Sequence, residues 1–157
     1  MPLKSSDVDV NALDKYEKTP LHHASEKNAR EVAAMFLERG DVDVNARNEF
    51  KKTSLHYAFE ENAHEVAAML LEKSAVDVNA RDEDARTPLH IASEKNAHKG
   101  ATMLLERGDV DVNSRDKLQR TPLHVASEWG GAHKVAAMIL NKRDDDVTLE
   151  TCGGKHH

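Results

Sequence analysis

The tetrapeptide Thr-Pro-Leu-His returns along this chain at a fixed interval. It occupies 19–22, 87–90 and 121–124, and Thr-Ser-Leu-His takes its place at 53–56. Each motif therefore begins 34 residues after the previous one. A short motif at a constant spacing indicates a repeat array, in which each unit packs only on its neighbours. We therefore expect a stack of small units rather than one globular core.

The chemistry of the tetrapeptide predicts how each unit begins. Thr19 can cap a helix, and Pro20 suits the first helical position because its missing N–H would have no partner there. The two ring nitrogens of His22 can bond back to the threonine and reach a backbone group of the neighbouring turn. We expect a short helix from Pro20, a turn at Asn28, which tolerates the left-handed conformation, and a second helix over 30–38.

Residues beyond the tetrapeptide carry a family resemblance. An alanine lies two positions after each motif histidine. Val-Asn-Ala occurs at 10–12, 44–46 and 78–80, and Val-Asn-Ser occurs at 112–114. With these residues the chain resembles an ankyrin-repeat array over about residues 7–150. The resemblance implies an all-α fold, an ankyrin-repeat solenoid of four helix-turn-helix units with short connecting hairpins. The alanines are Ala24, Ala58, Ala92 and Ala126.

The period also predicts the organisation of the chain. Residues 1–150 are expected to form a single domain, and Thr148 in place of an asparagine predicts the end of the array. Residues 151–157 are expected to form a C-terminal tail, whose final histidines are typical of a tag remnant. The units are expected at about 14–47, 48–81, 82–115 and 116–150, preceded by a hairpin segment at 7–13.

Composition narrows the possible partners and compartments. The chain is 39% hydrophobic and 32% charged, which suits a thin solenoid with much surface. Its net charge of -6 disfavours nucleic acid, and no apolar run is long enough to span a membrane. The chain's start lacks a signal-peptide core, and Cys152 has no second cysteine to pair with. We therefore expect a cytoplasmic or nuclear monomer whose partner is a protein.

Residues that could catalyse a reaction or bind a metal do not converge in the expected fold. The motif histidines recur once per unit, and packed helices lie about 8–10 Å apart, whereas zinc ligands lie about 2 Å from one ion. Asp41 and Asp43 imitate the start of a calcium loop, but Ala46 and Lys52 stand where glycine and glutamate are needed. No glycine-rich phosphate loop occurs, and Cys152 has no positioned base. We expect no catalysis, no cofactor and no metal.

Several positions depart from the repeat pattern. Gly100 stands where other units have valine, so we expect the third unit to have the weakest second helix and Gly100→Val to stabilise the fold. Phe59 replaces a serine, and we expect either an exposed anchor or a source of strain. Val32 and Met35 are expected to face the core. The hairpins lack the glycine that the family usually has before Thr-Pro, so a left-handed backbone is not expected there.

The resemblance places a binding surface by register. In ankyrin arrays the hairpin tips and the adjoining face of the first helices commonly form a concave binding surface. Exposed aromatic and arginine side chains are the usual interface anchors, and a row of glutamates on the first helices favours a partner with a basic segment. The predicted partner-binding residues are Leu13, Tyr16, Arg47, Phe50, Arg81, Asp84, Glu94, Arg115, Leu118 and Trp129.

Two alternatives to an interaction module remain open. Ankyrin repeats that resemble this one are substrates of an asparaginyl hydroxylase, with a leucine eight residues before the asparagine as a favoured context. Asn45, Asn79 and Asn113 fit that pattern. The second alternative is an engineered or purely structural repeat scaffold, although the irregular second unit argues against an idealised design.

Overall fold

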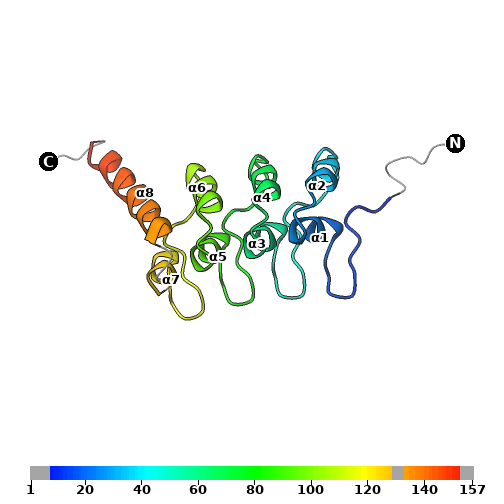
Figure 1. The fold of residues 1–157 in the computed structure, drawn as a ribbon, viewed down its shortest axis with the longest axis horizontal. Coiled ribbons are helices and arrows are strands. Elements are labelled where there is room, and N and C mark those ends of the chain that lie inside the picture. Colours follow the sequence, from blue (N-terminus) through cyan, green and yellow to red (C-terminus); the bar gives the residue numbers. More distant parts are fainter. Residues whose placement is uncertain (1–7, 129–132, 153–157) are drawn as a thin grey trace.

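The described part of the chain is a stack of helix pairs in two layers (Figure 1). The computed structural model describes residues 8–128 and 133–152, with side chains as far as Lys142. Within that part no strand occurs, so the all-helical stack of four helix pairs predicted from the sequence is confirmed. The helices are α1 (Pro20–Glu26), α2 (Arg30–Leu37), α3 (Ser54–Glu60), α4 (His64–Leu71), α5 (Pro88–Glu94), α6 (His98–Glu106), α7 (Pro122–Glu128) and α8 (His133–Cys152).

Each first helix begins at a reciprocal cap between a threonine and the motif histidine. Thr19 is extended, with φ −87° and ψ 167°, and its hydroxyl accepts from the backbone N–H of His22. The backbone N–H of Thr19 in turn donates to Nδ1 of His22 over 2.9 Å. The same pair of bonds starts α3 at Thr53 and α5 at Thr87. The tetrapeptide thus forms a capping box in which histidine replaces the usual glutamate.

The core runs continuously between the two layers. Leucines of the first helices, such as Leu21, Leu55 and Leu89, are fully buried against small or branched residues of the second helices. Each unit has a short apolar face and buries it against the next unit, as expected for a linear array. In Figure 1 the odd-numbered helices form one layer, and the connecting loops project beyond that layer to the same side.

The first unit exposes residues that were expected to face the core. Val32 is 39% exposed and Met35 is 60% exposed, whereas Met138 at the matching position of the last unit is half-buried. Thr102 of the third unit contacts the sulfur of Met138 through its hydroxyl. Met138 therefore faces the preceding unit, and the described chain has no unit before α1 and α2 that Met35 could face. The prediction was wrong for this end of the stack.

Non-glycine residues take the left-handed conformation at every hairpin tip. The expectation that this conformation would be avoided is wrong, because four residues at the matching position have φ between 61° and 64°. An aspartate fixes the first of these turns: Oδ1 of Asp14 accepts from the backbone N–H of Tyr16 and of Lys18. The hydrogen bond from His23, with these backbone bonds, lowers the pKa of Asp14 to about 2. The left-handed residues are Glu17, Lys51, Ala85 and Gln119.

The two departures at positions 59 and 100 form one contact. Phe59 is only 2% exposed, so it is not an exposed anchor, and the space beside Gly100 accommodates its ring. A Cβ added to Gly100 would come within 2.6 Å of Cδ1 of Phe59 and closer still to Cε1. The glycine therefore leaves no void, because the phenyl ring of the preceding unit fills the space of the missing side chain. The premise that Gly100→Val would restore missing packing is wrong.

The last unit ends differently from the other three. Thr148, which was expected to mark the end of the array, lies within α8, and this helix continues to Cys152. In Figure 1 the C-terminal part of α8, drawn in red, points outward from the stack. Trp129 and the rest of 129–132 lie outside the described residues, as do 1–7 and 153–157.

Candidate functional site

The hairpin tips form an ordered row along one side of the stack. Main-chain hydrogen bonds connect them: the N–H of Glu49 donates to the carbonyl of Tyr16 over 3.2 Å, and the N–H of Glu83 donates to the carbonyl of Phe50 over 2.9 Å. The N–H of Lys117 donates to the carbonyl of Asp84 over 3.0 Å. Each tip is therefore held by the next one. We call the four residues in this register the tip row: Tyr16, Phe50, Asp84 and Leu118.

The tip row presents large apolar side chains to solvent. Tyr16 is 47% exposed, Phe50 is 42% exposed and Leu118 is 72% exposed. Leu13, at the start of the first hairpin, is also exposed, and it borders the hollow at the N-terminal end of the stack. Asp84 interrupts the row, and among the described residues its carboxylate forms no ion pair. The sequence-based prediction placed these five residues on one surface. The hairpins of the tip row project to the same side of the stack in Figure 1, and the role of these residues in binding stays a prediction.

The three arginines predicted as anchors are on the same side but are already engaged. The guanidinium of Arg47 donates to the carbonyl of Arg81, and that of Arg81 donates to the carbonyl of Arg115 over 2.6 Å. Arg115 donates to the carbonyl of Gln119 in its own hairpin over 2.8 Å. All three side chains are exposed. Arg47 and Arg81 therefore connect one hairpin to the next, whereas Arg115 holds its own hairpin. We call these three side chains the arginine clasp, and they form a fixed edge of the tip row.

The glutamates of the first helices are paired within their own units. Each accepts from a basic residue eight positions earlier, for example Glu26 from Nζ of Lys18 over 3.0 Å and Glu60 from Nζ of Lys52 over 2.5 Å. Although burial alone would lower it, the pKa of Lys18 is raised, because the Glu26 carboxylate holds the ammonium. The row is therefore not an unpaired acidic strip. The other two pairs are Arg86–Glu94 and Arg120–Glu128.

Tyr57 joins the first two units beneath this face, and sequence reasoning missed it. The Nζ atoms of Lys18 and Lys52 lie 4.7 Å and 5.5 Å from its ring centre, and the His22 ring meets it edge-on. Its hydroxyl accepts from Nδ2 of Asn48 over 2.6 Å, and burial raises the pKa of Tyr57. An aspartate stands at the Asn48 position in the other three units. The replacement of this aspartate by Asn48 in the same unit as Tyr57 was the sequence signal that could have identified the contact.

The motif histidines of the first three units are structural. Nε2 of His22 donates to the carbonyl of Lys52 over 2.9 Å, and His56 and His90 make the same bond to the next unit. Burial lowers the pKa of all three rings, so they are neutral. In residues 8–128 and 133–152, no cluster of three or more potential ligands could hold a metal ion.

The candidate modification sites lie at contacts between units. Nδ2 of Asn45 donates to the carbonyl of Ala75 over 2.8 Å, and its Oδ1 accepts from the N–H of Asp77 over 2.8 Å. Asn79 makes the matching bonds one unit later. Asn113 is exposed. Hydroxylation at these residues stays a prediction, and a hydroxylase would have to open the contacts at Asn45 and Asn79 to reach the amides.

Comparison with known proteins adds to this geometry. In the part of the chain that the structure describes, no helix has the length and apolarity needed to cross a membrane. None of the curated proteins searched matches the chain. The family model for ankyrin repeats in three copies matches residues 2–82 and again residues 74–151. Together these matches cover nearly every residue, so the chain belongs to the ankyrin-repeat family.

Proposed function

We propose that this chain binds a protein partner through the tip row, Tyr16, Phe50, Asp84 and Leu118, with the arginine clasp as its edge. Ankyrin repeats are generally protein-interaction modules and are generally not enzymes. The observation that carries the proposal is the combination of exposed apolar tips with tip-to-tip main-chain hydrogen bonds. Because the tips are already ordered, little conformational entropy is lost when a partner docks.

The exposed groups define the chemistry of the partner. Apolar side chains would pack on Tyr16 and Phe50 at one end of the row and on Leu118 at the other. A lysine or arginine would lie opposite Asp84, whose carboxylate has no cation of its own among the described residues. Successive tips are about 8–10 Å apart. An extended segment spans that distance in about three residues, and a helix in about two turns.

The basic group of the partner is assigned to Asp84 rather than to the glutamate row. Those glutamates are already paired with Lys18, Lys52, Arg86 and Arg120. A competing cation would have to replace an existing ion pair, which gains little at a solvent-exposed surface. A single unpaired carboxylate between apolar groups is the better recognition point, because it selects the charge of the partner without adding repulsion.

The test is capture from a lysate of source cells by the immobilised chain, followed by titration of each purified binder. We expect Tyr16→Ala with Phe50→Ala to lower the affinity of a specific binder by at least about tenfold, since exposed aromatic anchors dominate interface energies. The matched control is Met35→Ala with Leu140→Ala, which removes two similarly exposed apolar side chains from the second-helix layer. This control should bind as the unaltered chain does.

The charge assignment has its own arm in the same experiment. Asp84→Asn should weaken the purified complex and flatten its dependence on salt, because one screened charge pair is removed. Equal loss of binding in the tip variant and in the second-helix control would place the interface elsewhere. Full binding by the tip variant would reject the proposed face.

A further inference from the structure

The three described contacts between successive units share one donor and one acceptor. Nε2 of a motif histidine donates to the carbonyl of the residue just before the next motif threonine. The pairs are His22 with Lys52 at 2.9 Å, His56 with Arg86 at 2.9 Å and His90 with Arg120 at 2.8 Å. The donor belongs to the C-terminal side of one unit, and the acceptor belongs to the N-terminal side of the next.

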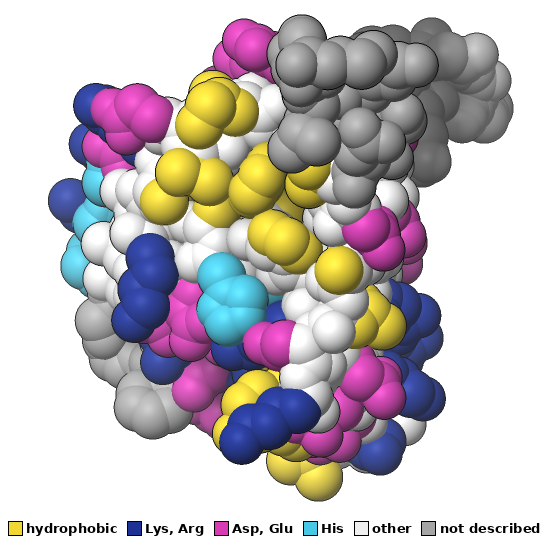
Figure 2. All heavy atoms as spheres, turned by 90° about the vertical axis from the view of Figure 1, so that its right-hand side faces the viewer, with side chains coloured by type: hydrophobic (Ala, Val, Ile, Leu, Met, Phe, Trp, Pro, Cys, Tyr) yellow, Lys and Arg dark blue, Asp and Glu magenta, His cyan; other side chains and the backbone are white. Residues whose placement is uncertain are grey.

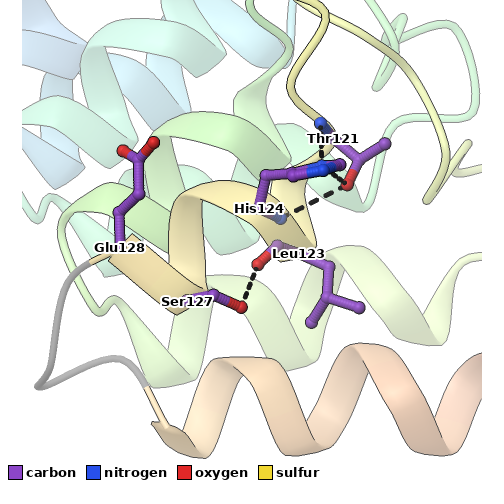
Figure 3. A pocket seen from close by; sticks show the side chains of 5 residues that line it. All are labelled: Thr121, Leu123, His124, Ser127 and Glu128. Carbon is purple, nitrogen blue, oxygen red and sulfur yellow. Dashed lines mark hydrogen bonds between the residues drawn. The ribbon is translucent and has the colours of Figure 1, made fainter.

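At the C-terminal end of the stack this donor has no acceptor. His124 makes the usual cap, since its Nδ1 accepts from the N–H of Thr121 over 3.0 Å. The ring is exposed, and within the described residues nothing accepts from its Nε2. The ring borders a hollow of about 470 Å³ that is also lined by Leu123, Ser127 and Glu128. Figure 3 shows these side chains on one side of α7, open at the position where another unit would stand.

At the N-terminal end the matching acceptor lacks its donor. The carbonyls of Lys52, Arg86 and Arg120 each accept a backbone N–H of their own hairpin as well as the histidine of the preceding unit. The carbonyl of Lys18 accepts only the hairpin N–H, from Asp14 over 3.0 Å, in the part of the chain that is described. This end also has an apolar hollow of about 590 Å³, visible as a cluster of hydrophobic side chains in Figure 2.

The packing register at the two ends also matches. Phe59 on α3 lies over Gly100 on α6 of the next unit. The same register sets Ser25 against Val66, which is fully buried, and Ser93 against Val135, which is also fully buried. If one more unit followed the last one in the same arrangement, Ser127 would face the residue of that unit that is equivalent to Val32. Ser127 is exposed and Val32 is 39% exposed, so each side chain lacks the neighbour that its equivalents have.

We propose that the C-terminal end of one copy of this chain stacks on the N-terminal end of a second copy, with His124 donating to the Lys18 carbonyl and Ser127 packing on Val32 of the second copy. The contact continues the internal repeat, so donor, acceptor and side-chain size are complementary at once. A generic apolar partner would fill the hollows but would leave the His124 donor and the Lys18 acceptor unpaired. Such unpaired groups weaken a buried contact.

The geometry limits the extent and the symmetry of this contact. Toward its C-terminus α8 points outward beyond α7 at this same end in Figure 1, so the contact is centred on α7. It joins two different surfaces and is therefore heterologous, which produces growing linear chains rather than a closed dimer. We expect the weak association that is typical of a small interface, visible only at high protein concentration.

The experiment uses one arginine at each end and sedimentation of the full chain from micromolar to millimolar concentration. The average mass of the unaltered chain should rise with concentration and show no plateau at the dimer. Ser127→Arg blocks one end and Val32→Arg blocks the other, so each variant alone should stay monomeric. An equimolar mixture of the two variants should form a one-to-one complex that does not grow, because one open end of each kind remains.

Control measurements separate this contact from other causes. Ala75→Arg places the same charge at an exposed apolar residue between the second and third units, far from both ends, and it should associate as the unaltered chain does. Circular dichroism checks that every variant is folded, and amide chemical shifts on dilution should change near Lys18 and His124. A monomeric unaltered chain at the highest concentration overturns the proposal, as does self-association of Ser127→Arg or Val32→Arg alone.

Discussion

The first contact, between the first and second units, has the same framework of hydrogen bonds as the second contact, between the second and third units. The two contacts differ in their filling, which is the set of side chains packed between the units. In both, a buried motif histidine donates to a carbonyl of the next unit. In the first contact Ser25 is at the position that faces Val66, whereas in the second contact Phe59 is at the position that faces Gly100. In each contact a larger residue on one side meets a smaller residue on the other. The packed volume is therefore kept, although the larger residue comes from the later unit in the first contact and from the earlier unit in the second.

A second difference concerns polar bonds at the same level of the stack. In the first contact Nδ2 of Asn28 donates to Glu65 over 2.6 Å, and its Oδ1 accepts from the N–H of Val66 over 3.3 Å. In the second contact Lys99 stands where Glu65 stands in the first, and Asn62 forms no such bond among the described residues. The second contact therefore depends more on the phenyl ring than the first depends on any one side chain.

The largest effect should come from breaking the filling of the second contact. Phe59→Ala removes a fully packed ring and should lower the free energy of unfolding by about 3–5 kcal/mol. Gly100→Val inserts a side chain into the ring and should lower it by about 1–3 kcal/mol. Urea denaturation measures both. A stabilising Gly100→Val would show that the ring moves aside without cost.

The double variant sharpens the same comparison. Phe59→Ser with Gly100→Val gives the second contact the filling of the first, so its destabilisation should be smaller than the sum of the single changes by about 1–3 kcal/mol. The matched control combines Ser25→Ala with Gly100→Val, whose sites lie in different contacts and should be additive. Additivity at positions 59 and 100 would contradict the proposed compensation.

The second prediction tests the shared framework against the open end. His90→Ala removes the second hydrogen bond to the part-buried Arg120 carbonyl and the acceptor of the Thr87 N–H in the helix cap, and should lower the free energy of unfolding by about 1–3 kcal/mol. His124 has the same cap but is exposed and has no acceptor in the described chain, so His124→Ala should cost about 0.5–1 kcal/mol, the value of the cap alone. Equal losses would show that the bond between units adds nothing.

The framework was predictable from the sequence because its chemistry is local. Thr19, Pro20 and His22 lie within one turn, so their spacing alone predicts a capped helix that begins at each motif. The second bond of His22 was also predictable, since a ring nitrogen left over from the cap must find a partner when it is buried. Exact repetition then carried these local predictions through the whole stack.

The filling was not predictable because it depends on which residues meet across units. Phe59 and Gly100 each look unfavourable when compared only with their own equivalents, and their relation appears only when the register between units is known. The same holds for Asn48 and Tyr57, which replace an aspartate and a variable residue in one unit. The arginine clasp and the paired glutamates likewise require the distances between hairpins and helices.

The third prediction concerns acid, which should weaken both contacts alike. Nδ1 of His22, His56 and His90 accepts from a threonine N–H, so the folded ring has no place for a second proton, and burial lowers each pKa below the ordinary 6.5. Below pH 6.5 the unfolded chain binds protons that the folded chain does not. The contribution is complete above that pH and is lost as the pH falls toward the folded pKa, by up to about 1.4 kcal/mol per histidine per pH unit.

Urea midpoints at about pH 7.5 and about pH 5.5 measure this loss. Hydrogen exchange at the lower pH, corrected for the intrinsic rate, should show similar added opening in α1 and α3, which carry His22 and His56. Stability that is unchanged between the two pH values would contradict the neutral framework. Opening confined to α3 would instead indicate that the phenyl ring, rather than the histidines, sets acid sensitivity.

The smallest expected effect tests the hairpins of the two contacts. Lys51 and Ala85 both have φ of 61° without being glycine, a conformation that disfavours a side chain by about 1–2 kcal/mol. Glycine relieves this strain but gives the unfolded chain about 0.5–1 kcal/mol of added entropy, so Lys51→Gly and Ala85→Gly should each stabilise by about 0.5–1 kcal/mol. Asn62→Gly is the control, because asparagine already tolerates its φ of 57°. Thermal midpoints should rise equally for the two hairpin variants and stay level for the control. If only one hairpin variant is stabilised, the backbone strain depends on the side chains that fill one contact. It is then not a property of the hairpin framework that both contacts share.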